Sequence, residues 1–184
     1  MDMSKKMLAH WESLCELHSR TKHYLLIAEE LSEDGNVFLQ PMKEHRDAYD
    51  HITRAYATEF QDELPTKETK DEYMDRNMKE AYSHEFRAFF DTADWLSFIC
   101  RRYIRTVLRN QSSKDLKGFE NYQEIKNMIN SMPAKIAEIR SRETVLENKD
   151  ELPKVVDARV AEYCTILDQL IKAYLLVREK FDNA

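Results

Sequence analysis

Only two glycines, Gly35 and Gly118, occur among the 184 residues, and each lies in a polar gap between long stretches with recurring apolar positions. Glycine weakens helix interiors and commonly follows helix ends, so a chain that nearly lacks it favours long, uninterrupted helices. The apolar residues recur every three or four positions, which is the spacing of a helix that buries one face. We therefore predict an all-α fold, an elongated antiparallel bundle of about five helices.

Proline, glycine and charged residues mark the expected ends of these helices. Pro41 fits the first turn of the second helix, where its missing N–H costs nothing. Pro133 is expected to split the fourth helix, because proline removes a backbone hydrogen bond and clashes with the preceding turn. The last helix, opened by Pro153, keeps an apolar seven-residue repeat as far as Phe181. The expected ranges are about 3–32, 41–60, 66–110, 122–146 and 153–181.

Composition predicts one globular domain over residues 1–184, since 42% apolar residues suffice for a single elongated core. The formal net charge of -6 argues against a protein that coats nucleic acid or an anionic membrane through its overall charge. A local basic patch remains compatible with RNA binding.

The cysteines and the hydropathy predict a cytoplasmic setting. Cys15, Cys100 and Cys164 are odd in number and far apart, so we expect small buried hydrophobic residues rather than a disulfide framework or a zinc site. No stretch approaches the about 20 apolar residues of a membrane span, and residues 1–11 lack the apolar segment of a signal peptide. No membrane association is expected.

Ionisable side chains are dense between Glu44 and Arg54. One interpretation needs no function: Arg46 and Asp50, and Asp50 and Arg54, are four residues apart, which suits ion pairs along one solvated helix face. The other interpretation treats this stretch as a site.

Arg46 and His51, with polar Asp47 directly after the arginine, resemble the R-x4-H signature of the HEPN superfamily, whose members are all-α bundles. The resemblance covers these six residues. It implies metal-independent RNA cleavage in a cleft between two protomers, or a non-catalytic role in binding nucleic acid or nucleotides. It also implies that His51 would transfer a proton at the ribose 2′-hydroxyl while Arg46 holds the scissile phosphate. Imidazole titrates near neutral pH and guanidinium matches phosphate oxygens, which suits these roles.

The spacing of this pair adds a condition. Five residues correspond to about 140° around a helix, so Arg46 and His51 do not point the same way. Both can serve one site only if the helix faces a cleft, most simply one formed with a second copy. We therefore predict a homodimer, joined through a heptad seam.

Two further groups are candidates for binding. His84, Arg87 and Asp91 lie on a polar line of the third helix and could face Arg46 to His51, although a solvent-facing edge with internal ion pairs is the alternative. Arg102 and Arg105 belong to a basic patch that could contact RNA phosphates, although arginines at a helix C-terminus also stabilise the helix dipole. The complete set of predicted binding residues is Glu44, Asp50, Arg54, His84, Arg87, Asp91, Arg102 and Arg105.

No metal and no cofactor are expected from the spacing of residues. The Glu-x-x-His pairs of di-iron bundles do not occur. Asp47 and His51 are spaced as a helix-stabilising pair, and His18 is expected to be a core or interface histidine.

The sequence thus favours a HEPN-like bundle that binds RNA or a nucleotide. The more specific hypothesis is that this bundle is a metal-independent endoribonuclease. The alternative is a non-enzymatic helical scaffold or protein-interaction module, acting as a homodimer or with an unidentified protein partner.

Overall fold

The computed structural model describes residues 5–32, 38–61, 63–142 and 158–182, and within these ranges the regular elements are all helices. This confirms the all-α prediction. The helices are α1 (Lys5–Leu31), α2 (Leu39–Ala57), the 3-10 turn η1 (Thr58–Phe60), α3 (Lys70–Arg109), α4 (Ser113–Lys117), α5 (Tyr122–Ser141) and α6 (Ala158–Phe181).

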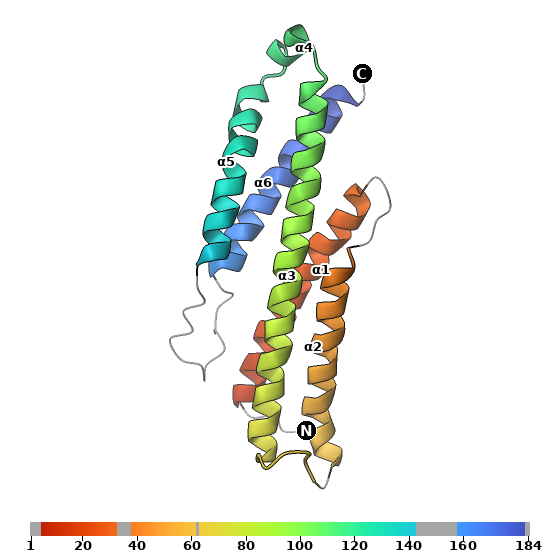
Figure 1. Ribbon diagram of the computed structural model, residues 1–184, viewed down its shortest axis with the longest axis vertical. Coiled ribbons are helices and arrows are strands. Elements are labelled where there is room, and N and C mark those ends of the chain that lie inside the picture. Colours follow the sequence, from red (N-terminus) through yellow and green to blue (C-terminus); the bar gives the residue numbers. More distant parts are fainter. Residues whose placement is uncertain (1–4, 33–37, 62, 143–157, 183–184) are drawn as a thin grey trace.

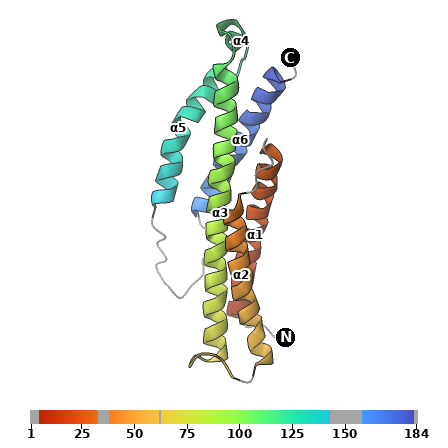
Figure 2. The same cartoon turned by 45° about the vertical axis from the view of Figure 1, so that its right-hand side comes forward.

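The long helix α3 is the central element of an elongated bundle (Figure 1). Its 40 residues correspond to a length of about 60 Å at 1.5 Å per residue. Both views show α1 and α2 beside its amino-terminal half and α5 and α6 beside its carboxy-terminal half (Figure 2). The two halves also meet directly, since the Tyr24 hydroxyl of α1 donates to Asp168 of α6 at 2.9 Å.

Side-chain pairs define the direction of the helices around α3. His51 of α2 pairs with Asn77, and Glu44, about two turns earlier, pairs with His84, so α2 and α3 are antiparallel. His18 of α1 contacts Glu85 of α3, and α1 runs parallel to α3, as expected for a chain that reverses twice.

A capping box sets the start of α3. The Thr69 side chain accepts a hydrogen bond from the backbone N–H of Glu72, and the Glu72 side chain accepts from the backbone N–H of Thr69. Two N–H groups that the helix leaves unpaired are thereby satisfied. The predicted start near residue 66 is therefore four residues early, because residues 66–69 belong to the cap and the loop before it.

The seven-residue repeat of the last helix is confirmed and is covered within the chain. Val160, Tyr163, Leu167, Leu170, Tyr174 and Val177 are all buried. Tyr163 packs edge-on against Phe89 of α3 with ring centroids 6.4 Å apart. The seam is thus not free to join a second copy, so a homodimer would have to use another face. Pro153, the predicted start of this helix, lies outside the described residues.

The predicted split at Pro133 is wrong, because α5 continues through this residue without a break. Pro133 has no N–H to donate to the carbonyl of Ile129, four residues earlier. The Arg105 guanidinium of α3 donates to that carbonyl instead, at 3.3 Å. A side chain from a neighbouring helix therefore replaces the missing backbone donor.

The apolar face of α2 also differs from the prediction. The spacing of Met42, Tyr49 and Ile52 predicts that they share one buried face, but Met42 and Tyr49 are 47% and 69% exposed. The buried residues of this helix are Pro41, Ala48 and Ala55, whose small side chains allow α2 to approach its neighbours closely. The buried face of α2 therefore lies around the helix from the predicted one, and ionisable side chains occupy the rest of the face that α2 turns toward α3.

The three cysteines do not share one environment. Cys100 and Cys164 are buried as expected, whereas Cys15 is exposed on α1, which corrects the prediction for that residue. None of the helices in the described ranges has the length and apolar character required to span a bilayer.

Candidate functional site

The candidate site is a set of polar side chains at the contact between α2 and α3. We call it the α2–α3 polar face, and it consists of Glu44 and His51 from α2 with Asn77, His84 and Arg87 from α3. The antiparallel register places these residues together, since advancing along α2 from 44 to 51 corresponds to returning along α3 from 84 to 77.

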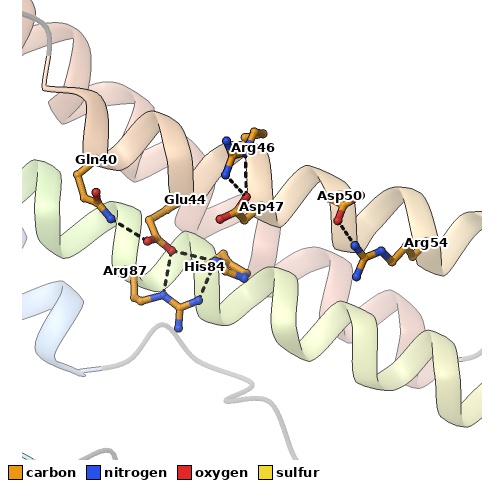
Figure 3. A network of polar contacts seen from close by, with 8 residues as sticks. All are labelled: Gln40, Glu44, Arg46, Asp47, Asp50, Arg54, His84 and Arg87. Carbon is orange, nitrogen blue, oxygen red and sulfur yellow. Dashed lines mark hydrogen bonds and ion pairs between the residues drawn. The ribbon is translucent and has the colours of Figure 1, made fainter.

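Glu44 anchors one end of this face (Figure 3). Its carboxylate, only 12% exposed, lies 2.9 Å from Nε of Arg87 and 2.8 Å from Nδ1 of His84. Burial of this carboxyl raises its pKa, but the hydrogen bonds from Arg87 and His84 outweigh burial and hold the pKa of Glu44 below its ordinary value. Glu44 is therefore a carboxylate at neutral pH.

His84 lies between a carboxylate and a guanidinium. Its Nδ1 is 2.8 Å from the Glu44 carboxylate and 2.7 Å from Nη2 of Arg87. When Nδ1 carries a proton it donates to Glu44, and when it does not it accepts from Arg87. Both protonation states of this nitrogen therefore have a partner, which suits a group that gains and loses a proton.

Asn77 fixes the tautomer of His51. The buried Asn77 amide donates through Nδ2 to the carbonyl of Tyr73 at 2.8 Å, so its Oδ1 faces Nδ1 of His51 at 2.9 Å. An amide oxygen only accepts, so Nδ1 of His51 is the protonated nitrogen and Nε2 of the neutral ring keeps its lone pair. His51 is thus arranged as a base through Nε2.

The two imidazoles of this face are neighbours. The rings of His51 and His84 stack with centroids 5.4 Å apart and an interplanar angle of 24°. The sequence analysis expected that His84 could face Arg46 to His51, and the structure brings His84 beside His51, although the two residues are 33 positions apart and come from different helices.

Arg46 lies at the edge of this face and not within it. Its guanidinium, 72% exposed, donates to Asp47 through Nε at 2.9 Å and Nη2 at 2.7 Å. The hydrogen bond from Arg46 lowers the pKa of Asp47, and the charges of His84 and His51 add to that effect. Among the described residues, no hydrogen bond joins Arg46 directly to His51.

The remaining predicted residues of α2 form an ion pair of their own. Arg54 and Asp50 bond to each other one turn apart, and both are more than half exposed. This is the pairing that the non-functional interpretation expected, and it places both side chains away from His84 and Arg87 (Figure 3).

The predicted residues farther along α3 are not part of the polar face. Burial raises the pKa of Asp91, which lies one turn beyond Arg87. Arg102 is exposed, and Arg105 donates to Ile129 in the half of the bundle formed with α5. Arg105 also lines a hollow of about 270 Å³ together with Arg109 and Lys126. The basic patch and the polar face are therefore separate.

A second polar cluster, missed from the sequence, lies where α1, α2 and α3 meet. His18 of α1 and His45 of α2 both place Nδ1 on the same oxygen of Glu85 of α3, at 3.1 and 2.8 Å. Spacing within one helix cannot find three residues from three helices. The available signal was Glu85 itself, an acidic residue in the otherwise apolar buried row of Ala81 and Ala88.

Neither the protein-family models nor the curated proteins nor the solved structures include a match to this chain. The geometry of the α2–α3 polar face and the chemistry of its side chains are therefore the basis for assigning a function.

Proposed function

We propose that the α2–α3 polar face binds RNA and that His51 and His84 cleave it there without a metal ion. The observation that carries this proposal is the hydrogen bond between His51 and the buried Asn77, which leaves Nε2 of His51 as a base beside a second imidazole. Two neighbouring imidazoles supply the base and the acid that transesterification of RNA requires.

The proposed reaction balances its protons between these two rings. Nε2 of His51 takes the proton of a ribose 2′-hydroxyl, whose oxygen attacks the adjacent phosphorus. The bond from phosphorus to the 5′-oxygen breaks, and protonated His84 gives its proton to that leaving oxygen. The products are a 2′,3′-cyclic phosphate and a 5′-hydroxyl. The Glu44 carboxylate, 2.8 Å from Nδ1 of His84, orients this ring.

Arginines at the border of the face provide contacts for phosphate. Arg46 and Arg87 are 72% and 50% exposed, and each is engaged with a carboxylate of α2. Ion pairs with exposed arginines contribute only about 0–1 kcal/mol, so a phosphate with two acceptor oxygens can replace a carboxylate at modest cost. Arg46 would then hold the phosphate, as the resemblance to HEPN proteins implies.

A second candidate function is a protein-interaction module. Leu39, Met42 and Tyr49 are 64%, 47% and 69% exposed and follow one another along the outer side of α2, with Arg46 among them. Such a row of exposed apolar residues at helical spacing is typical of a face that packs on another helix. A second copy of this chain at this face would also enclose Arg46, which links the two candidate functions.

The test is cleavage of an end-labelled RNA in the presence of a chelator. We expect His51→Ala and His84→Ala to lower the rate by at least about 100-fold, the usual contribution of a general acid or base. The matched control is His23→Ala, which removes an exposed imidazole from α1. The absence of cleavage by the unmodified protein, or equal rates in all variants, would contradict the enzymatic proposal.

Binding and assembly are measured separately. RNA binding by fluorescence anisotropy should weaken in Arg46→Ala and in Arg87→Ala, and it should depend on salt concentration. Sedimentation should detect a dimer that Tyr49→Glu dissociates. A protein that binds no RNA but dimerises through α2 would favour the interaction module.

A further inference from the structure

The cluster that α1, α2 and α3 form around Glu85 lacks an explanation in the proposed RNA site. Glu85 is 4% exposed and lies in the middle of α3, where a carboxylate without compensating charge is costly. His18 and His45 provide its neighbours, and their rings meet edge to face with centroids 5.2 Å apart.

The hydrogen bonds of this cluster are unevenly distributed. Both Nδ1 atoms approach Oε1 of Glu85, at 3.1 and 2.8 Å, whereas the buried Oε2 has no hydrogen-bond partner among the described residues. For a pair of neutral histidines, this arrangement crowds two N–H groups onto one oxygen and leaves the other unsatisfied. A buried acceptor without a partner usually indicates a group that the protein atoms alone do not supply.

We infer that His18, His45 and Glu85 form a binding site for one divalent first-row transition-metal ion, of which Zn²⁺ is the test case. The three residues each offer one ligand atom, and these atoms all lie within 4.8 Å of one another. A metal with bonds of about 2.1 Å holds its ligand atoms no more than about 4.2 Å apart. A small rotation of one side chain would bring all three ligand atoms within this distance.

The exposure of the three ligands suits that adjustment. The His18 side chain is 52% exposed, so its rotation displaces few packed neighbours, whereas the side chains of His45 and Glu85 are 17% and 5% exposed and lie between the helices. Two residues thus form a rigid base and the third closes onto the ion. Water can reach the site from the side of His18 and complete the coordination.

The donor set selects the class of metal. Two imidazole nitrogens and one carboxylate oxygen suit Zn²⁺, Fe²⁺, Co²⁺ or Ni²⁺, whereas Mg²⁺ and Ca²⁺ prefer oxygen ligands alone. Three protein ligands leave at least one coordination position for water or another small molecule. The ion would also link α1 to α2 and α3, because each helix contributes one ligand.

This inference does not depend on the RNA proposal, since cleavage there is tested with a chelator present. The experiment is titration of the full chain, free of any histidine tag, with Zn²⁺ by calorimetry, and with Co²⁺ by visible absorption. We expect one ion per chain and a higher melting temperature with Zn²⁺. His18→Ala should weaken binding by at least about 10-fold, the effect already seen when a residue that only hydrogen-bonds to a metal ligand is changed.

Matched variants keep the test sharp. His18→Ala removes a half-exposed side chain and should leave the fold intact, which circular dichroism checks. Glu85→Gln keeps the shape of the buried residue, removes its charge, and should also weaken Zn²⁺ binding. His23→Ala, on the same helix, should bind Zn²⁺ as the unmodified protein does. No binding by the unmodified protein, or equal affinity in folded His18→Ala and His23→Ala, would overturn the inference.

Discussion

Arg105 donates a hydrogen bond at 3.3 Å to the carbonyl of Ile129, which Pro133 leaves without a helical donor. The contact explains how α5 continues through a proline in its interior. It also gives the arginine a structural role, which adds to the sequence-based alternatives of RNA binding and dipole stabilisation.

Replacing Arg105 by methionine should lower the free energy of unfolding by about 1 kcal/mol, the usual contribution of one hydrogen bond. Pro133→Ala restores a backbone N–H for the Ile129 carbonyl, so Arg105→Met should cost clearly less in that background. Urea unfolding of the two single variants and the double variant gives the coupling energy. Equal costs in both backgrounds would show that the contact does not compensate for the proline.

Tyr163→Phe should destabilise the chain by about 1–3 kcal/mol, because the buried hydroxyl donates a hydrogen bond to the side chain of Asp94. Tyr103→Phe is the control, since its hydroxyl bonds to Asp182 at the surface and its loss should cost less. Chemical unfolding at neutral pH compares the two. A larger effect at Tyr103 would contradict the importance of burial.

The same tyrosine should make the free energy of unfolding depend on pH in alkaline solution. Burial and the hydrogen bond to Asp94 raise the pKa of Tyr163 above its ordinary value of 10. The folded chain therefore holds the phenol proton more tightly than the unfolded chain. Its contribution is complete below about pH 10 and is lost as the pH rises further. Unfolding free energies measured from about pH 8 to 11 should fall less steeply in Tyr163→Phe.

Glu44 should contribute to stability in the opposite pH range. Its pKa in the folded chain lies below the ordinary 4.5, since the bonds from Arg87 and His84 outweigh burial. The contribution is present above about pH 4.5 and disappears as the pH falls through the lower, folded-state pKa. Glu44→Gln should therefore flatten the acid side of the stability profile. An unchanged acid side would indicate that these contacts do not persist in solution.

The thiols should react in a fixed order. Cys15 is exposed, whereas burial raises the pKa of Cys100 to about 12 and leaves almost no thiolate at neutral pH. A thiol-specific reagent should thus modify Cys15 in the folded protein and all three cysteines only after denaturation. Cys15→Ser should abolish the early reaction. Rapid modification of Cys100 in the folded state would contradict its burial.

Local patterns in the sequence predicted most of the fold. The repeat from Val160 to Val177 predicted both the helix and its buried face, because one helix period decides both. The five-residue α4, inside a gap assigned as a loop, is too short to show such a period. The exposure of Tyr49 was also missed, since an apolar side chain alone does not reveal which face a neighbouring helix covers.

The candidate site was predicted only in part. Glu44, His84 and Arg87 were selected from the sequence as binding residues, and the structure brings them together. Asn77 was not among the residues selected from the sequence, because its hydrogen bond to His51 depends on the register between α2 and α3. Glu85 gains its partners only when three helices meet. Such contacts depend on how the helices pack and do not produce a periodic pattern in the sequence.

The helix α3 belongs to both halves of the bundle, and this affects how the chain unfolds. Its amino-terminal half completes the core with α1 and α2, and its carboxy-terminal half completes the core with α5 and α6. Because one continuous helix serves both cores, and Tyr24 of α1 also bonds to Asp168 of α6, unfolding of one half removes contacts that support the other. We expect a single cooperative transition, in which circular dichroism and tryptophan fluorescence report one common midpoint, and no fragment ending within α3 that folds alone.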